Sequence, residues 1–405
     1  DIDFLYKKGF HPDFLEYLKE FLFKGCICGM KEGEIVFPVE PVLRVEGRLI
    51  EVQLAETMLL NILNYQSLIA TKASRVRLSA GNRTLTDFGL RRAQGTGAIH
   101  GSRAAIVGGF DKTSNVMAAS MHNIEPSGTM AHSYIESFDN ELDAFRAYAR
   151  IFPDDCVLLV DTYNTLRSGL PNAIKVGLEL KEQGHLLRGI RLDSGDLAYL
   201  SKKARNMLDE AGLPHTKIIV SNQLDEFVVK SLLDQGAPID VFGVGTSMIT
   251  GRPDGALDGV FKLSSVNGRP KLKISENIQK TTLPGNKKVL RYFNAEGQFY
   301  ADCIATENET EPEIMIHPFE KEKSLSLKGH KYEELFFCSM KDGKLTEKPV
   351  PPHELKERVY TRLALLPEEH KRFDYPHIYK VGVSEALLNL QSDIIKKLQK
   401  HILPP

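Results

Sequence analysis

Short runs of β-branched and other apolar residues alternate with helical stretches between positions 102 and 246. One such stretch carries Ala173, Val176 and Leu180 at the spacing of a single helix face. Each helix between two strands brings the chain back to the same sheet, so the alternation predicts βα units built around a parallel sheet. The predicted strands lie at 105–107, 157–160, 189–192, 218–220 and 241–244.

A polar residue closes each of the last four predicted strands: Asp161, Asp193, Asn222 and Thr246. They are separated by 32, 29 and 24 residues, which is the length of one strand, loop, helix and loop. In an α/β barrel these side chains would meet at the carboxyl ends of the strands, where barrel enzymes keep their active sites. A doubly wound open sheet gives the same local pattern, but no Gly-x-Gly-x-x-Gly follows the first strand, so we favour the barrel.

The length of 405 residues suits two domains. After residue 258 the βα rhythm stops, and turn dipeptides such as Asn267-Gly268 separate short strands. We expect this β segment to pack with strands predicted at 34–45 into a discontinuous, mainly β second domain. We also expect helices over 49–78 and 384–398. The predicted parts are an N-terminal strand and helix part at 1–90, the barrel with the active site at 91–257, the β part at 258–350 and a C-terminal helical tail at 351–405.

Charge and hydropathy exclude two classes of partner. With 52 basic and 53 acidic residues the net charge is −1, so no overall field attracts nucleic acid or an anionic membrane. No stretch reaches the ~20 apolar residues of a membrane span, and no signal peptide opens the chain. An anionic ligand would therefore be held by a local cluster of cations, and the predicted location is cytoplasmic.

The five cysteines are scattered along the chain and odd in number. This pattern predicts no disulfide framework and favours a reducing compartment. Cys26 and Cys28 lack a second Cys/His pair at zinc spacing, so we expect strand or buried cysteines there rather than a zinc site. The others are Cys156, Cys303 and Cys338.

His132 is the candidate catalytic base or nucleophile. It lies in Gly128-Thr129-Met130-Ala131-His132-Ser133, directly after a turn-forming Glu-Pro-Ser. An imidazole nitrogen can accept a proton or attack phosphorus. A lone histidine is more often a packed structural residue, so its neighbours decide between the two interpretations.

Three further segments carry groups suited to a phosphorylated sugar. The adjacent Arg91 and Arg92 could bind phosphate oxygens bidentately. Arg191 and Asp193 share one strand face because side chains alternate with period two, and such an aspartate can hold ribose hydroxyls or Mg²⁺. The segment 243–247, Gly-Val-Gly-Thr-Ser, could cradle a terminal phosphate. Surface salt bridges and helix capping remain the alternatives for the charged residues.

Six stretches of the sequence resemble the nicotinate phosphoribosyltransferase family, over nearly the whole chain. The resemblance implies a type II phosphoribosyltransferase-like fold, an irregular TIM-like α/β barrel with a β second domain. It also implies a reaction of NAD salvage, in which nicotinate and 5-phosphoribosyl 1-diphosphate give nicotinate mononucleotide and diphosphate with coupled ATP hydrolysis. The stretches are Val36-Phe37-Pro38 through Leu43-Arg44-Val45-Glu46-Gly47, Phe88-Gly89-Leu90-Arg91-Arg92-Ala93-Gln94-Gly95, Gly128-Thr129-Met130-Ala131-His132-Ser133, Leu159-Val160-Asp161-Thr162-Tyr163, Arg191-Leu192-Asp193-Ser194-Gly195-Asp196 and Lys280-Thr281-Thr282-Leu283-Pro284-Gly285.

The resemblance implies roles for individual residues. His132 matches the histidine that is transiently phosphorylated, with ATP as co-substrate. Asp161 and Asp193 match positions associated with ribose and with Mg²⁺-diphosphate, so these three are the expected catalytic residues and the two aspartates the expected Mg²⁺ ligands. Thr129 and Arg191 match positions that hold the nicotinate carboxylate. The other expected substrate-binding residues are Arg91 near the diphosphate, Gly245 and Thr246 at the 5-phosphate, Asn222 and Ser114.

Ser114 bears on the choice of substrate. At this position the related nicotinamide enzyme carries an aspartate, which would repel nicotinate, so the serine favours the acid. Nicotinamide phosphoribosyltransferase is the close rival, and a non-catalytic nucleotide-sensing barrel is the rival of another class. The resemblance also implies a homodimer with shared sites. Family members usually begin with several dozen further residues, including an aromatic residue that stacks on the pyridine ring across the dimer interface.

Overall fold

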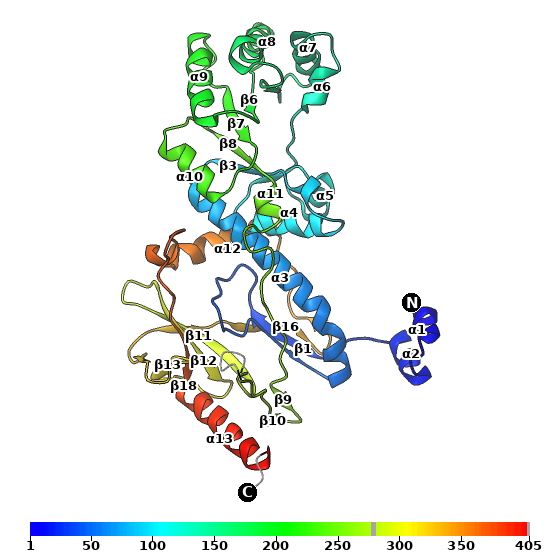
Figure 1. Ribbon diagram of the computed structural model, residues 1–405, viewed down its shortest axis with the longest axis vertical. Helices are drawn as coiled ribbons and strands as arrows, with labels where there is room; N and C mark the ends of the chain where they lie inside the picture. Colours follow the sequence, from blue (N-terminus) through cyan, green and yellow to red (C-terminus); the bar gives the residue numbers. More distant parts are fainter. Residues whose placement is uncertain (277–280, 403–405) are drawn as a thin grey trace. The chain divides into compact units, whose positions relative to one another are not determined.

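The computed structural model describes residues 1–276 and 281–402 and divides into two compact units. One unit, here the β unit, comprises Asp1–Asn61, Val260–Pro349 and Thr361–Pro405; the other, here the α/β unit, comprises Ile62–Gly259 and Val350–Tyr360. The helices α3 (Leu49–Ala80) and α12 (Pro352–Leu365) carry residues of both units (Figure 1). Lys280, which opens the last motif shared with the family, lies outside the described residues. Among the described helices, none is both long and apolar enough to cross a membrane.

The α/β unit is built on six parallel strands with helices between them (Figure 1). In sequence order the strands are β3 (Thr84–Asp87), β4 (Lys112–Thr113), β5 (Val157–Leu159), β6 (Gly189–Leu192), β7 (Lys217–Ser221) and β8 (Val241–Val244). The helices are α4 (Gly97–Val107), α5 (Val116–His122), α6 (His132–Glu136), α7 (Glu141–Ile151), α8 (Leu170–Glu182), α9 (Leu197–Glu210), α10 (Glu226–Asp234) and α11 (Thr246–Ile249). Helix α8 packs against both α7 and α9.

The central strands form because their apolar side chains are buried in the core of the unit. Ile190 and Leu192 of β6 are fully buried, as are Ile218 and Val220 of β7, and all four belong to one hydrophobic core. Helix α9 starts where its N-cap residue Asp196 accepts a hydrogen bond from a backbone N–H of the first turn. The four strands predicted near 157–160, 189–192, 218–220 and 241–244 are confirmed.

The sheet is open. Its order, β4-β3-β8-β7-β6-β5, follows the cyclic order of a barrel, but no ladder joins β4 to β5 within the described ranges. The predicted α/β class with a parallel sheet and a mainly β second part is confirmed, whereas the predicted closed barrel is not. The chain between β4 and β5 is occupied by three helices, and β4 has only two residues, so little strand edge is available for closure.

The strand predicted at 105–107 is wrong, because these residues end helix α4. Ala104, Ala105 and Ile106 are buried there, since small side chains allow this helix to pack closely within the core. The strands that do open the sheet, β3 and β4, were not predicted. Both contain threonine and charged residues, so neither produces an apolar run.

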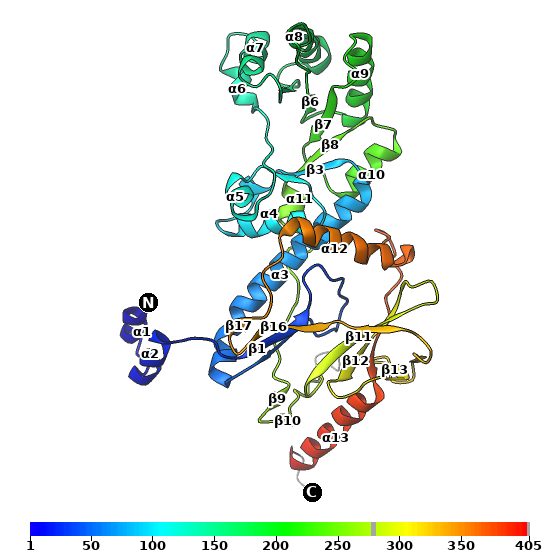
Figure 2. The same ribbon diagram turned by 180° about the vertical axis from the view of Figure 1, so that it is seen from behind.

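In its described residues, the β unit contains two larger sheets and a hairpin. The four-stranded sheet has the order β17-β16-β1-β2, and β17 at its edge is labelled in Figure 2. The six-stranded sheet has the order β14-β13-β18-β12-β11-β15, in which only β12 and β18 run parallel, and α13 packs against it. The elements are α1 (Ile2–Lys7), α2 (Pro12–Lys19), β1 (Cys26–Met30), β2 (Leu43–Glu46), β9 (Ser265–Val266), β10 (Arg269–Pro270), β11 (Lys287–Phe293), β12 (Phe299–Thr306), β13 (Ile314–Ile316), β14 (Ser324–Ser326), β15 (Tyr332–Glu334), β16 (Phe336–Lys341), β17 (Lys344–Leu345), β18 (Val381–Ser384) and α13 (Glu385–Ile402).

The strands predicted at 34–45 are displaced in the structure. β1 ends at Met30 and β2 begins at Leu43, so most of the predicted stretch is a connecting loop. Pro38 and Pro41 lack the N–H that a strand ladder needs, and Val39 between them has φ 69°, outside the extended region. The apolar residues of this loop serve in packing rather than in a strand. Phe37, for example, stacks on Tyr379.

A buried ion cluster anchors this loop to the six-stranded sheet. Arg291 of β11 is fully buried and donates through Nε and Nη2 to Asp302 of β12, at 2.9 and 2.6 Å to its nearest oxygens. Its Nη1 donates to Glu34 at 2.6 Å, and Tyr379 donates to Asp302 at 2.9 Å. These bonds satisfy a cation that would otherwise be costly to bury.

Glu40, on the same loop, is expected to make the stability of the protein depend on pH. Burial and the nearby charge of Asp302 raise its pKa to about 10. Because the folded pKa lies above the unfolded value of 4.5, the stabilising contribution is complete below pH 4.5 and is lost as pH rises toward 10. We expect the free energy of unfolding to fall across this window by up to about 1.4 kcal/mol per pH unit, less where solvent reaches the half-buried side chain.

Glu40→Gln should remove most of this slope, because an amide has no proton to lose. Urea denaturation at pH 5, 7 and 9 measures it, with Glu296→Gln, at an exposed turn residue, as the control. A pH slope shared by the wild type and Glu40→Gln would contradict the assignment.

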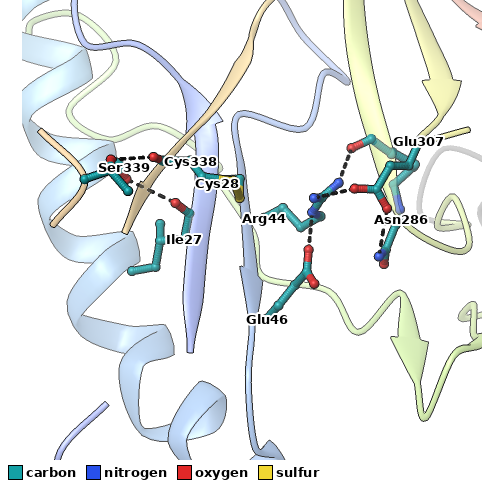
Figure 3. Close-up of a disulfide and its surroundings, with 10 residues drawn as sticks. Ile27, Cys28, Arg44, Glu46, Asn286, Glu307, Cys338 and Ser339 are labelled. Carbon is teal, nitrogen blue, oxygen red and sulfur yellow. Dashed lines mark hydrogen bonds and ion pairs between the residues drawn. A yellow bond between two sulfur atoms is a disulfide. The ribbon is translucent and has the colours of Figure 1, made fainter. Parts of the chain in front are cut away.

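Cys28 and Cys338 form a disulfide with an S–S distance of 2.03 Å (Figure 3). The two residues face each other across the antiparallel pair β1 and β16. The prediction of unpaired cysteines is therefore wrong for these two, because a pairing over 310 residues leaves no local trace in the sequence. Cys26, Cys156 and Cys303 are free. The expected reducing compartment loses the support that it drew from unpaired cysteines.

Candidate functional site

The candidate site lies where β5, β6 and β7 end. Asp161 follows β5 by two residues, Asp193 follows β6 directly, and Ser221 is the last residue of β7. Because these neighbouring strands are parallel, their carboxyl ends lie along one edge of the sheet. The sequence thus brings polar groups from distant segments to one place.

Arg191 is the centre of the site. Its Nη1 donates to Thr129 Oγ1 at 2.7 Å, its Nη2 to Asp193 Oδ1 at 2.8 Å and its Nε to Ser221 Oγ at 2.9 Å. The guanidinium carbon lies 5.2 Å from the centre of the Phe88 ring, within cation–π range. Among the described residues, one N–H on each terminal nitrogen has no protein partner. The group is therefore fixed in orientation and retains donors for an anionic ligand.

His132 is held by Asp161 in the same network. His132 Nε2 lies 3.1 Å from Asp161 Oδ1. The other oxygen of Asp161 accepts from the backbone N–H of Asp193 at 2.8 Å and from Ser194 Oγ at 2.6 Å. The Asp161 side chain is 1% exposed and the His132 side chain 39%. Because an ionised carboxylate only accepts, this contact favours the proton on Nε2 and leaves the Nδ1 lone pair free for chemistry.

The remaining predicted residues lie at strand ends but outside this network. Within the part of the chain that the structure describes, no hydrogen bond or ion pair connects any of them to Arg191 or His132. Ser114 follows β4 and Asn222 follows β7, while Gly245 and Thr246 follow β8, and Arg91 lies in the 3-10 turn Leu90–Arg92 after β3. They therefore share the carboxyl edge of the sheet with the network.

Gly245 is required where it stands, since a Cβ there would lie 2.9 Å from the carbonyl oxygen of Phe88. Phe88 is the residue whose ring faces Arg191. The glycine therefore lets the turn after β8 approach the segment that supports the guanidinium.

Several contributors were missed from the sequence. Asp87, fully buried at the end of β3, accepts from the Gly89 N–H and from Thr113 Oγ1, both at 2.7 Å, and so fixes the turn that carries Arg91. Burial raises the pKa of Asp87. Ser194 and Ser221 were not assigned a role. Each stands beside a polar strand-end residue that was identified, Asp193 or Asn222, but nothing in the sequence shows what their hydroxyls contact.

The two aspartates differ in their fitness to hold Mg²⁺. Both oxygens of Asp161 are occupied by protein donors, so it does not fit as a direct ligand in this arrangement. Oδ2 of Asp193 has no protein partner among the described residues and is the oxygen that fits. In the described ranges no group of three or more His, Cys, Asp or Glu residues could hold a metal ion by itself. Mg²⁺ commonly binds through one or two carboxylates together with substrate phosphates.

Comparison with known proteins gives a consistent result along the whole chain. Residues 83–310 match the model of the nicotinate phosphoribosyltransferase (NAPRTase) family, residues 1–64 match its N-terminal domain and residues 286–391 its C-terminal domain. The nicotinate phosphoribosyltransferase of Bacillus subtilis (strain 168) is 45% identical over 97% of this chain and 82% of its own length. The protein of that name from Homo sapiens is 33% identical over 95% of this chain and 82% of its own.

Solved structures give the same result. The crystal structure of human nicotinic acid phosphoribosyltransferase is similar with a TM-score of 0.87 and 31% identity, over 97% of this chain and 88% of the human one. That of nicotinate-nucleotide pyrophosphorylase from Pyrococcus furiosus has a TM-score of 0.70 and 26% identity, over 84% and 81%. With its sequence and its fold in agreement, the chain belongs to the nicotinate phosphoribosyltransferase family.

Proposed function

We propose that the chain transfers a phosphoribosyl group from 5-phosphoribosyl 1-diphosphate to nicotinate, with ATP hydrolysis coupled through phosphorylation of His132. The products are nicotinate mononucleotide and diphosphate, as in NAD salvage. The observation that carries the proposal is the continuous network in which Thr129, Arg191, Asp193, Asp161 and His132 are linked by hydrogen bonds. A carboxylate clamp and a reactive imidazole thereby occupy one site.

In the transfer step, the pyridine nitrogen attacks the anomeric carbon with its lone pair. The bond from that carbon to the diphosphate oxygen breaks, and its electrons leave with the diphosphate. Arg191 and Thr129 hold the nicotinate carboxylate, since a guanidinium suits it in shape and charge. The carboxylate of Asp193 stabilises the oxocarbenium-like sugar, and Arg91 offsets charge on the leaving group. Mg²⁺ bound to the diphosphate, with Asp193 Oδ2 as a ligand, would neutralise further negative charge.

The substrate is held along the same edge of the sheet. We assign the 5-phosphate to the N–H groups and hydroxyl at Gly245 and Thr246, and we include Asn222 and Ser114 among the substrate-binding residues. In the coupled step, Nδ1 of His132 attacks the terminal phosphorus of ATP, ADP leaves, and later hydrolysis of phosphohistidine releases phosphate. Asp161 orients the ring for this attack. The homodimer implied by the family resemblance is part of the proposal, and light scattering measures it.

Ser114→Asp tests the choice of substrate. A carboxylate at this position would repel the nicotinate carboxylate but not neutral nicotinamide. We expect the kcat/KM for nicotinate to fall roughly tenfold to a hundredfold, the scale of like-charge juxtaposition, and the preference over nicotinamide to fall with it.

Ser114→Asn, which is similar in size and uncharged, is the matched control and should retain the preference for nicotinate. Steady-state measurement of kcat/KM for nicotinate and for nicotinamide in each variant tests this prediction. A wild type that uses only nicotinamide would refute the proposed function.

A further inference from the structure

We propose that Ser221 is a positioning residue that keeps Arg191 and Asp193 from closing into a two-bond salt bridge with each other. Both charged groups then remain available, the guanidinium to the nicotinate carboxylate and the carboxylate to the phosphoribosyl donor. The inference rests on the proposed function and names a further determinant of the same site. Ser221 is 2% exposed, so its hydroxyl acts inside the protein rather than in solvent.

The hydrogen bonds of the Ser221 hydroxyl have a fixed direction. Arginine only donates, so Ser221 Oγ accepts from Arg191 Nε, at 2.9 Å. An ionised carboxylate only accepts, so the hydroxyl proton goes to Asp193 Oδ1. Since Arg191 Nη2 also donates to that oxygen, at 2.8 Å, the three side chains form a closed ring of hydrogen bonds.

Without the serine, the two charged groups have a simpler way to pair. Arg191 and Asp193 are two residues apart on one strand face, and arginine–carboxylate pairs commonly form two parallel bonds. Such a pair would use Nε together with Nη2 and would engage both oxygens of Asp193. Ser221 occupies Nε, so Asp193 meets the guanidinium through Oδ1 alone and Oδ2 stays unengaged by protein groups among the described residues.

The backbone around Ser221 supports this assignment. Ser221 pairs with Gly243 across β7 and β8. A Cβ on Gly243 would lie 2.4 Å from the Phe88 ring, so the glycine makes the space in which that ring faces Arg191. The guanidinium is thus bounded by an aromatic face and, at its edges, by Ser221 at Nε, Asp193 at Nη2 and Thr129 at Nη1.

Kinetics test the inference. We expect Ser221→Ala to raise the KM for nicotinate roughly tenfold to a hundredfold, the scale of one hydrogen bond to a charged group. The KM for 5-phosphoribosyl 1-diphosphate should rise as well, because the closed pair would also engage Oδ2 of Asp193. Ser221→Thr restores the hydroxyl and should stay within about threefold of the wild type. Ser201→Ala is the matched control, since Ser201 is equally buried but bonds only a carbonyl of its own helix, at 3.1 Å. An unchanged KM for nicotinate in Ser221→Ala, or a Thr variant as impaired as Ala, would overturn the inference.

A crystal structure of Ser221→Ala tests the inference independently of activity. It should show both oxygens of Asp193 bonded to Nε and Nη2 of Arg191, and Nη1 withdrawn from Thr129. If Arg191 instead keeps its wild-type contacts, the inference is wrong even where the kinetics change. If the wild type failed to use nicotinate, the proposed function would fall, and this structure would still decide whether Ser221 separates the two charges.

Discussion

His132→Ala is expected to abolish ATP stimulation of nicotinate mononucleotide formation. ATP hydrolysis measured with nicotinate and 5-phosphoribosyl 1-diphosphate present should fall by roughly a hundredfold or more, the scale on which loss of one catalytic side chain acts. The reason is that no other imidazole is joined to the Arg191 network among the described residues, so no neighbour replaces the phosphoryl acceptor. Binding of 5-phosphoribosyl 1-diphosphate, measured by calorimetry, should change less than about threefold.

His185→Ala is the matched control for this experiment. His185 also pairs with a carboxylate, Asp154, with 2.8 Å between Nδ1 and Oδ1, but outside the Arg191 network. Its replacement should leave ATP stimulation intact. Undiminished ATP stimulation in His132→Ala would show that the phosphohistidine role is wrong, and absence of a phosphorylated histidine in the wild type during turnover would show the same.

Arg191→Ala is expected to cause the largest loss toward nicotinate. Truncating one partner of a partly buried, hydrogen-bonded charge pair costs about 2–5 kcal/mol, which corresponds to roughly thirtyfold to a thousandfold or more in kcat/KM. Two effects add in this case: the carboxylate of the substrate loses its partner, and the charge of Asp193 is left uncompensated beside it. The loss should appear mainly in the KM for nicotinate.

Two further variants test whether the loss comes from the fork-shaped guanidinium of Arg191. They are Arg191→Lys and the control Arg146→Ala. Lysine keeps the charge but lacks the planar fork, so it should recover only part of the activity. Arg146 pairs with Glu179 on the surface of the same unit, and its removal should leave the kinetics unchanged. A normal KM for nicotinate in Arg191→Ala would exclude this residue as the carboxylate clamp.

The part of the site on β5 and β6 could be predicted because its cause is local. Apolar residues dominate both strands apart from Arg191 in β6, and the aspartate that follows each run marks the strand end, which locates Asp161 and Asp193. The partnership between them could not be predicted, since it depends on which strands are neighbours. Ser221 illustrates the same limit: a serine that ends a strand shows in sequence neither its burial nor the two charges on either side of it.

The first two strands of the sheet, β3 and β4, could not be predicted for a different reason. β3 and β4 are short and contain polar residues, whose burial is made possible by contacts such as that of Asp87 with Thr113. The apolar run at 105–107 predicts a strand, although its small residues belong to a packed helix. Long-range pairing, and not local preference, decided both cases.

The sulfur bridge between Cys28 and Cys338 gives the molecule a topological property. The backbone between these two cysteines is a covalently closed loop, and residues 62–259 of the α/β unit lie within it. A single proteolytic nick anywhere in that loop would leave one molecule, separable into two chains only by reduction. Tension applied to the two chain ends would pass through the bridge, so the backbone of residues 62–259 would be shielded from stretching, whereas residues 350–360 of the same unit lie outside the loop.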